Sequence, residues 1–210
     1  MTSLLLAAAL GFQQPAPLKY TLKENTRTFA KAEFNLTRFK DGSLRHRWVV
    51  SEIGGDKKSS FTDEMIWDAA ARPKVFKRVM NEGGGVTTIT GLFFDNRVEV
   101  TFQSNGLREM ETHPAPTKHS TVNPATYWFV DSKPKVGARA TVAEFDFENM
   151  EWVVISIIYK GVEKLTVGGR TVNAHRIDRG SDETVWVDDQ ARPIRQQERD
   201  AGTLITLERI

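Results

Sequence analysis

Polar and apolar residues alternate along most of the chain from Leu18 onward, a pattern typical of half-buried β-strands. In the segment Thr28–Phe39, for example, one face carries Ala30, Ala32, Phe34 and Leu36. Short turn sequences separate such segments, and Asp41-Gly42 is a strong signal for a tight hairpin. The alternation and the turns together predict an antiparallel meander.

The segment His113–Gly137 interrupts this pattern with a proline-rich stretch that has no periodicity. Asn123-Pro124 then supplies the N-cap and the first-turn proline of a helix, which we expect over Pro124–Val130. An isolated helix of this length is marginal in water. Its aromatic residues are therefore expected to plug an opening in the sheet, and they are Tyr127, Trp128 and Phe129.

A nearly continuous apolar run, Trp152–Tyr159, lies within the strand expected over Glu151–Thr166. β-Branched residues dominate the run, and it is too short to span a membrane. Such a run is typical of a strand that is covered on both faces. It predicts the central strand of the sheet.

One sequence unit occurs twice, beginning at Asp63 and at Asp182. Each copy reads Asp-Glu-x-x-Trp, then Ala-Arg-Pro, a basic run, a glycine turn and a Thr/Ile strand. The pattern equates Trp67 with Trp186 and predicts that both fix the register of the core, while the arginines before the prolines lie on turn surfaces. In the alternative interpretation, each tryptophan and the arginine after it form a cation–π pair that faces a ligand.

These elements predict a mainly β protein of about a dozen strands in a strongly curved antiparallel meander, a half-barrel or incomplete barrel with one short helix plug. A two-sheet β-sandwich is the alternative. Residues 18–210 are expected to form a single domain with a proline-rich and helical insertion at 113–137. Residues 1–17 have an apolar run followed by small residues and prolines, which favours a signal peptide and linker. We therefore expect a periplasmic or secreted protein.

Composition excludes several kinds of chemistry. The chain has 210 residues and no cysteine, so disulfides, thiolate nucleophiles and cysteine-based zinc sites are impossible. The net charge is only +2 and the two signs are interleaved, which argues against nucleic-acid binding. No P-loop, dinucleotide fingerprint or nucleophile elbow is present, and no catalytic residue or cofactor is predicted.

The histidines and one acidic row are the remaining candidates for chemistry. His113 and His119 are expected in one loop with a spacing that fits no common zinc pattern, and His46 and His175 are expected on strands, so no metal site is predicted. Alternation places three carboxylates on one strand face, opposite Phe145 and Phe147. We interpret this face as solvated. The alternatives are a row of calcium ligands or an acid–base pair as in glycosidases. The carboxylates are Glu144, Asp146 and Glu148.

Two motifs near the C-terminus carry a resemblance. Gly161–Gly169 reads Gly-x-Glu-x-Leu-x-Val-Gly-Gly, and Trp186-Val187-Asp188 is followed by Pro193-Ile194-Arg195. The pair resembles bacterial exported proteins of unknown function that are related to the outer-membrane lipoprotein carrier (LolA-like) superfamily. The likeness covers Gly137–Ile210, with Leu18–Phe102 similar only in pattern. It implies a curved half-barrel that, in characterised relatives, shelters acyl chains or other apolar ligands.

Three functional hypotheses follow. The first is a non-enzymatic exported β-module whose curved sheet shelters a lipid or other apolar small molecule. The second is an envelope protein-interaction or structural module without a ligand, and the third, more remote, is a hydrolase that would need Glu144, Asp146 or His175 to converge in one pocket. The first hypothesis assigns as ligand-lining residues Phe34, Leu36, Tyr127, Trp128, Phe129, Trp152 and Val154.

Overall fold

The computed structural model describes residues 16–53, 59–131, 133–200 and 202–210. Over these residues the chain forms one antiparallel sheet of 14 strands and a single turn of 3-10 helix. The predicted mainly β meander is confirmed, and the strands belong to one sheet rather than to the two sheets of a sandwich. The predicted signal peptide lies almost entirely outside the described residues.

The strands fall into two consecutive meanders. The first contains β1 (Leu18–Glu24), β2 (Arg27–Arg38), β3 (Leu44–Glu52), β4 (Ser59–Trp67), β5 (Pro73–Glu82), β6 (Gly85–Phe94), β7 (Arg97–Ser104) and β8 (Leu107–Pro114). The second contains β9 (Arg139–Asp146), β10 (Glu151–Val167), β11 (Arg170–Arg179), β12 (Glu183–Val187), β13 (Pro193–Asp200) and β14 (Thr203–Arg209). Pairing of β1 with β14 joins the two meanders into one sheet, whose edges are β8 and β9.

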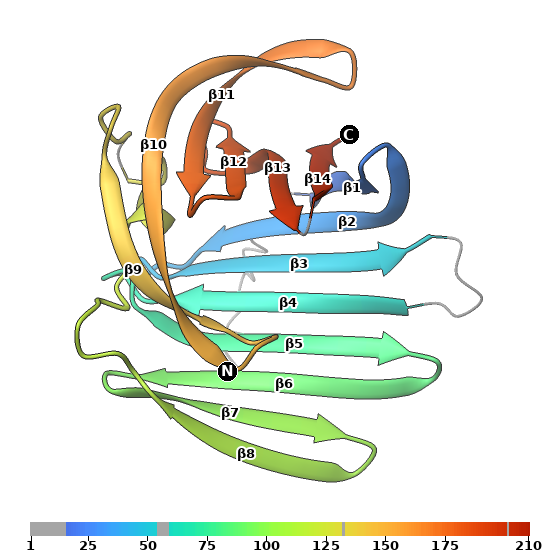
Figure 1. The fold of residues 1–210 in the computed structure, drawn as a ribbon, viewed down its shortest axis with the longest axis vertical. Coiled ribbons are helices and arrows are strands. Elements are labelled where there is room, and N and C mark those ends of the chain that lie inside the picture. The colour runs from blue at the N-terminus through green and yellow to red at the C-terminus, as the bar shows by residue number, and fades with distance from the viewer. Residues whose placement is uncertain (1–15, 54–58, 132, 201) are drawn as a thin grey trace, which may run out of the picture.

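The sheet rolls until its β9 edge lies over its own concave side. Figure 1 shows β9 and β10 passing steeply in front of the β3–β6 strands. Side chains confirm this contact, because Phe145 and Trp152 pack in one cluster with Phe76 of β5 and Phe93 of β6. The two edges do not pair with each other. The architecture is therefore an incomplete barrel.

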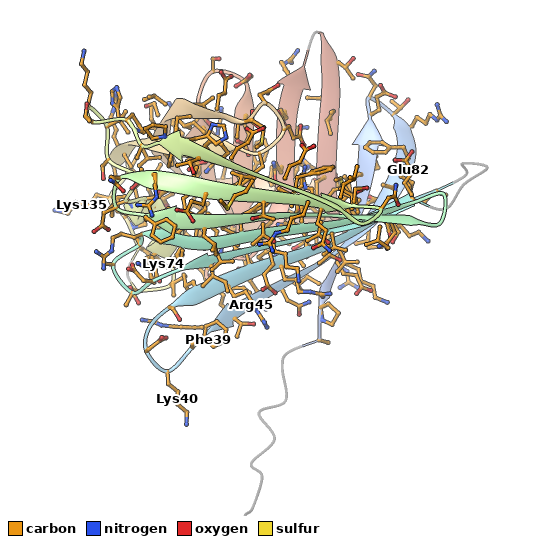
Figure 2. All side chains as sticks on the ribbon, turned by 90° about the horizontal axis from the view of Figure 1, so that it is seen from below. Phe39, Lys40, Arg45, Lys74, Glu82 and Lys135 are labelled. Atoms are coloured by element: carbon orange, nitrogen blue, oxygen red, sulfur yellow. The ribbon has the colours of Figure 1, made fainter. Side chains whose placement is uncertain are left out.

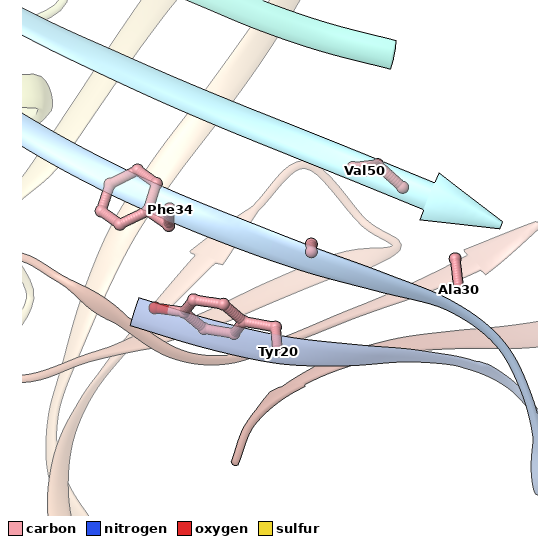
Figure 3. Packing of buried hydrophobic residues seen from close by; sticks show 5 residues of the cluster. Tyr20, Ala30, Phe34 and Val50 are labelled. Atoms are coloured by element: carbon pink, nitrogen blue, oxygen red, sulfur yellow. The ribbon is translucent and has the colours of Figure 1, made fainter. Parts of the chain in front are cut away.

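A cluster near the β1–β14 junction anchors the middle of the sheet. Tyr20, Ala30, Phe34 and Val50 project together from β1, β2 and β3 and are almost completely buried (Figure 3). The Tyr20 hydroxyl donates a hydrogen bond of 2.7 Å to the Pro193 carbonyl oxygen, and burial raises the pKa of Tyr20 to about 12. The N-terminal strand is thereby tied to the C-terminal meander.

The turns gather at the two ends of the strands. Figure 2 shows Lys40 and Lys74 at one end of the sheet and Glu82 at the other. Lys40 belongs to the predicted Asp41-Gly42 hairpin between β2 and β3. On this hairpin the guanidinium of Arg45 lies 5.6 Å from the ring centre of Phe39, a cation–π contact on the outer surface.

The predicted helix over Pro124–Val130 is shorter than expected. A 3-10 turn covers Pro124–Tyr127, with Asn123 as N-cap, and the backbone then extends at Trp128. Tyr127 packs with Leu44 and Ala71, and Phe129 packs with Tyr159 and Val187. Trp128 packs against the Phe129 cluster and also against Ala140 and Val142. Burial of these rings stabilises a segment too short to be a helix by itself.

The sequence repeat produces two nearly identical turns. In both, an aspartate side chain accepts hydrogen bonds from two backbone N–H groups and from the arginine before the proline, with all distances between 2.8 and 3.0 Å. Ala71 and Ala191 occupy the same left-handed position, with φ of 61° and 63°. The two aspartates are Asp68 and Asp188. The predicted turn surface is confirmed for Arg72, whose side chain is 47% exposed.

The predicted equivalence of Trp67 and Trp186 is wrong. Aligning the two turns pairs Trp67 with Val187, because Trp186 lies one residue farther from its turn. Side chains alternate with period two along a strand, so an offset of one residue places the two rings on opposite faces. Trp67 faces the concave side near His46, whereas Trp186 packs with Leu165 and Ile194 in another cluster.

Two further predictions need correction. The strand with the apolar run, β10, is next to the sheet edge rather than central, and the centre is the β2–β1 pair. The run is apolar because β10 crosses the concave side of the sheet and is covered on both faces. Trp152 packs on β6 from one face of β10, and Ile157 packs with residues of β9 on the other face of β10. His113 is not in a loop, because it lies within β8, next to the last residue of the strand, and its ring contacts Phe145.

Candidate functional site

Two adjoining cavities lie on the concave side of the sheet. The larger has a volume of about 370 Å³ and lies between β3–β6 and the crossing strands β9 and β10. The smaller has a volume of about 220 Å³ and lies between β2, β12 and the 3-10 turn. Three residues line both cavities, and they are His46, Asn123 and Arg179.

Aromatic side chains are the largest group in the wall of the larger cavity. Phe147 stacks on Phe76 with ring centres 3.9 Å apart, and Phe93 meets Trp152 edge-on at 6.2 Å. Trp48, Trp67 and Phe145 complete this aromatic wall. Offset and edge-on contacts of this kind fix ring positions as well as burying apolar area.

Arg179 is the cation between the two cavities. Its guanidinium bonds Glu144 at 2.9 Å and Glu183 at 2.8 Å, and Asn123 donates to the other oxygen of Glu144 at 2.8 Å. Gln196 donates to Glu183 at 3.0 Å. Burial opposes the charge of Arg179, but the two carboxylates outweigh it and raise its pKa above the usual range. Both carboxylates are therefore already paired.

A second ion pair lies on the concave side. Arg78 binds Asp63 through two hydrogen bonds of 2.7 Å, and its third nitrogen bonds Glu148 at 3.0 Å. The hydrogen bonds that Arg78 donates to Asp63, together with the charge of this carboxylate, raise the pKa of Arg78. This bidentate geometry is the strongest form of an arginine–carboxylate pair. The guanidinium of Arg78 is thus also neutralised by carboxylates of the chain.

His46 lines both cavities and makes no hydrogen bond to any described residue. Its ring lies 4.6 Å from the ring of Trp67 and 5.6 Å from that of Phe34. Burial lowers the pKa of His46 to about 4, so the imidazole is neutral at pH 7. In β3, every second residue from Leu44 to Val50 lies on the same face of the strand, and this set contains Leu44, His46, Trp48 and Val50. The three apolar members of the set are the sequence signal that His46 points inward.

The candidate catalytic groups lie in separate networks. Glu144 bonds Arg179, and Asp146 accepts hydrogen bonds within the turn after β9 from Glu148 and Asn149. His175 bridges the Tyr159 hydroxyl at 2.8 Å and the Asp189 carboxylate at 2.9 Å. These groups share no hydrogen-bond partner among the described residues.

The acidic row is not the solvated face that alternation predicted. Glu144 is half-buried and lines the larger cavity, and Asp146 is also half-buried, whereas Glu148 is 72% exposed. The prediction failed for Glu144 because strand β9 is covered on both sides, by β5 and β6 on one and by β11 on the other. No group of three or more metal-ligating side chains occurs in the described part of the chain.

The predicted lining residues are distributed unevenly. Phe34, Trp128 and Phe129 line the smaller cavity, and Trp152 lines the larger one. Leu36 packs in the neighbouring core, and the Tyr127 hydroxyl donates to backbone oxygens of Asp68 and Gly42. Val154 is 49% exposed. Sequence reasoning missed the polar residues of the cavities, because the approach of β9 and β11 to β3 depends on how the sheet rolls.

Comparison with known proteins gives the fold. No protein-family model and no curated protein matches the chain. A solved β-barrel-like protein of the domain of unknown function DUF1849 from Brucella abortus is similar, with a TM-score of 0.57, 7% identity and coverage of 93% of this chain and 94% of that one. A DUF1089 family protein from Pseudomonas aeruginosa gives a TM-score of 0.42 at 13% identity, covering 81% and 90%. The likeness to the DUF1849 protein shows that the chain has a β-barrel-like fold.

Within the described residues, no helix has the length and apolar character needed to cross a membrane.

Proposed function

We propose that this protein is a non-enzymatic, exported binding module that holds an apolar small molecule on the concave side of its sheet. The observation that carries the proposal is the aromatic-lined cavity of about 370 Å³ between β3–β6 and β9–β10. Ligand sites typically have volumes of about 300–1,000 Å³, mostly apolar walls and a few placed polar groups. This cavity has all three features.

Two further considerations support the proposal. Asn123, Glu144 and Arg179 are bonded to one another and Asp63 is bonded to Arg78, so the surface open to a ligand is mostly apolar. The sequence motifs resemble the LolA-like superfamily, whose characterised members shelter apolar chains in a half-barrel. The apolar segment within residues 1–17 supports export to the periplasm or the medium.

An exposed apolar patch around Tyr127–Phe129 would support the alternative of a protein-interaction module. Tyr127 and Phe129 are instead 9% and 7% exposed and belong to separate core clusters. The cavity therefore favours the ligand-binding proposal over this alternative.

Fluorescence titration with the neutral apolar probe N-phenyl-1-naphthylamine tests the proposal. We expect saturable enhancement with one probe per chain. Thr121 lies in the loop before the 3-10 turn and lines the larger cavity. Thr121→Trp should fill part of the cavity and weaken binding at least about tenfold, which corresponds to about 1.4 kcal/mol.

Thr117→Trp is the matched control, because Thr117 lies in the same loop but is exposed. It should bind the probe like the wild-type protein. Lack of saturable enhancement, or equal binding by both variants, would overturn the proposal.

A further inference from the structure

We infer that the ligand carries an uncharged hydrogen-bonding group, such as a hydroxyl, a carbonyl or an amide, and that His46 binds this group. The inference rests on the proposed ligand-binding function and specifies the ligand class. It follows from which polar groups of the two cavities are already paired and which are open.

The charged residues of the cavities leave no cation for an acidic head group. Arg179 lines both cavities and is held by Glu144 and Glu183. Arg78, which lines neither cavity, is held by the lining residue Asp63 and by Glu148. An anionic ligand would therefore place an additional buried negative charge beside carboxylates. Burying a charge without a partner is strongly unfavourable. A free fatty acid or a phosphate is thus poorly matched to this wall.

A cationic head group is also poorly matched. The carboxylates of Asp63, Glu144 and Glu183 already accept hydrogen bonds from arginines. A cation would have to compete with these guanidinium groups, whose geometry is fixed by the sheet. It would lose its own hydration without gaining an unpaired carboxylate.

His46 is suited to a neutral polar group. It lines both cavities at their junction and makes no hydrogen bond to a described residue. A neutral imidazole offers one donor and one acceptor. A second donor lies in the wall of the larger cavity, because the indole Nε1 of Trp152 is buried with no hydrogen-bond partner among the described residues. Each group would gain a partner from a hydroxyl or carbonyl oxygen.

Competition against N-phenyl-1-naphthylamine by molecules with one common chain tests the inference. The series is 1-dodecanol, dodecanoate and dodecylamine at pH 8, each below its aggregation concentration. We expect 1-dodecanol to displace the probe at a concentration at least about tenfold lower than either charged analogue, the factor that corresponds to about 1.4 kcal/mol. Dodecanoate or dodecylamine competing as well as the alcohol would overturn the inference.

Variants of His46 complete the test. His46→Phe should lose at least about fivefold in its affinity for 1-dodecanol relative to its own affinity for the probe, whereas His46→Gln, which keeps a donor and an acceptor, should retain most of this ratio. His119→Phe changes an exposed loop histidine and should have no effect. Equal alcohol binding by His46→Phe and the wild-type protein would assign the selectivity to another group. Failure of the wild-type protein to bind the probe would instead reject the proposed function.

Discussion

Gly91 of β6 lies directly against the ring of Phe147, so that a Cβ atom at position 91 would overlap the ring. Phe147 follows the edge strand β9 and stacks on Phe76 of β5. The absence of a side chain at position 91 therefore allows the rolled edge of the sheet to pack on its own concave side.

This contact predicts that Gly91→Ala is destabilising. Overpacking should cost about 1–3 kcal/mol, although alanine is ordinarily preferred to glycine within a strand. In a Phe147→Ala background the added methyl group would have room, so the same substitution should cost little. Urea denaturation of the four proteins measures the coupling. An equal cost in both backgrounds would show that Phe147 does not occupy this position.

The repeated turns predict a second set of effects. Asp188 accepts hydrogen bonds from the backbone of Gln190 and Arg192, and its carboxylate also binds Arg209 near the C-terminus at 3.1 Å. Asp188→Ala should therefore reduce the free energy of unfolding by about 2–3 kcal/mol, because several donors lose their partner together. Thermal denaturation is the measurement.

Asp68 forms the same turn without the contact to a C-terminal arginine. We expect Asp68→Ala to cost about 1–2 kcal/mol, less than the change at Asp188. Asp95→Ala, at an exposed turn, serves as the control and should be nearly neutral. If all three variants unfold at the same temperature, the side-chain bonds in these turns do not contribute to stability.

The half-buried charges around Arg179 predict non-additive mutational effects. Arg179→Met should leave Glu144 and Glu183 without their cation and reduce stability by about 3 kcal/mol. The triple variant Arg179→Met, Glu144→Gln, Glu183→Gln removes all three charges and should regain most of this loss. Calorimetry of the single and triple variants distinguishes this outcome from simple addition, which would contradict the pairing.

His46 predicts a pH dependence of stability. Its pKa is about 4 in the folded protein, below the ordinary value, so the unfolded chain binds more protons between about pH 6.5 and pH 4. Stability is fully present above about pH 6.5 and should fall by up to about 3 kcal/mol as the pH drops through this window. Asp68 and Asp146 have lowered pKa values and lose their contributions only at more acidic pH.

Denaturant unfolding across pH 4–7 measures this effect. His46→Gln should flatten the dependence in this window, whereas His119→Gln, in an exposed loop, should leave it unchanged. An unaltered slope in His46→Gln would mean that the imidazole is not desolvated in the folded state.

Much of the fold is encoded locally. The alternation in Thr28–Phe39 and the Asp41-Gly42 turn correctly predicted β2, β3 and their hairpin, because face and turn preferences act over neighbouring residues. The meander followed from repeating such units. The curvature was also expected, because a meander of about a dozen strands joined by short turns is typical of a sheet that closes or curls.

The candidate site could not be predicted in the same way. Local pattern assigns a side chain to one face of its strand, but it does not say which other strand will cover that face. Glu144 therefore appeared solvated, although Arg179 covers it. The one-residue difference in spacing before the second turn similarly reversed the face of Trp186 relative to Trp67. Both errors arise from long-range arrangement rather than from local preference.

Native mass spectrometry of the protein, expressed with its N-terminal segment in a bacterial host and purified without detergent, tests the central claim most directly. The account predicts a complex heavier than the chain by one small hydrophobe, which organic extraction releases and which carries an uncharged polar group. A chain mass without addition, together with no saturable uptake of N-phenyl-1-naphthylamine, would contradict the claim that the concave cavity is a binding site.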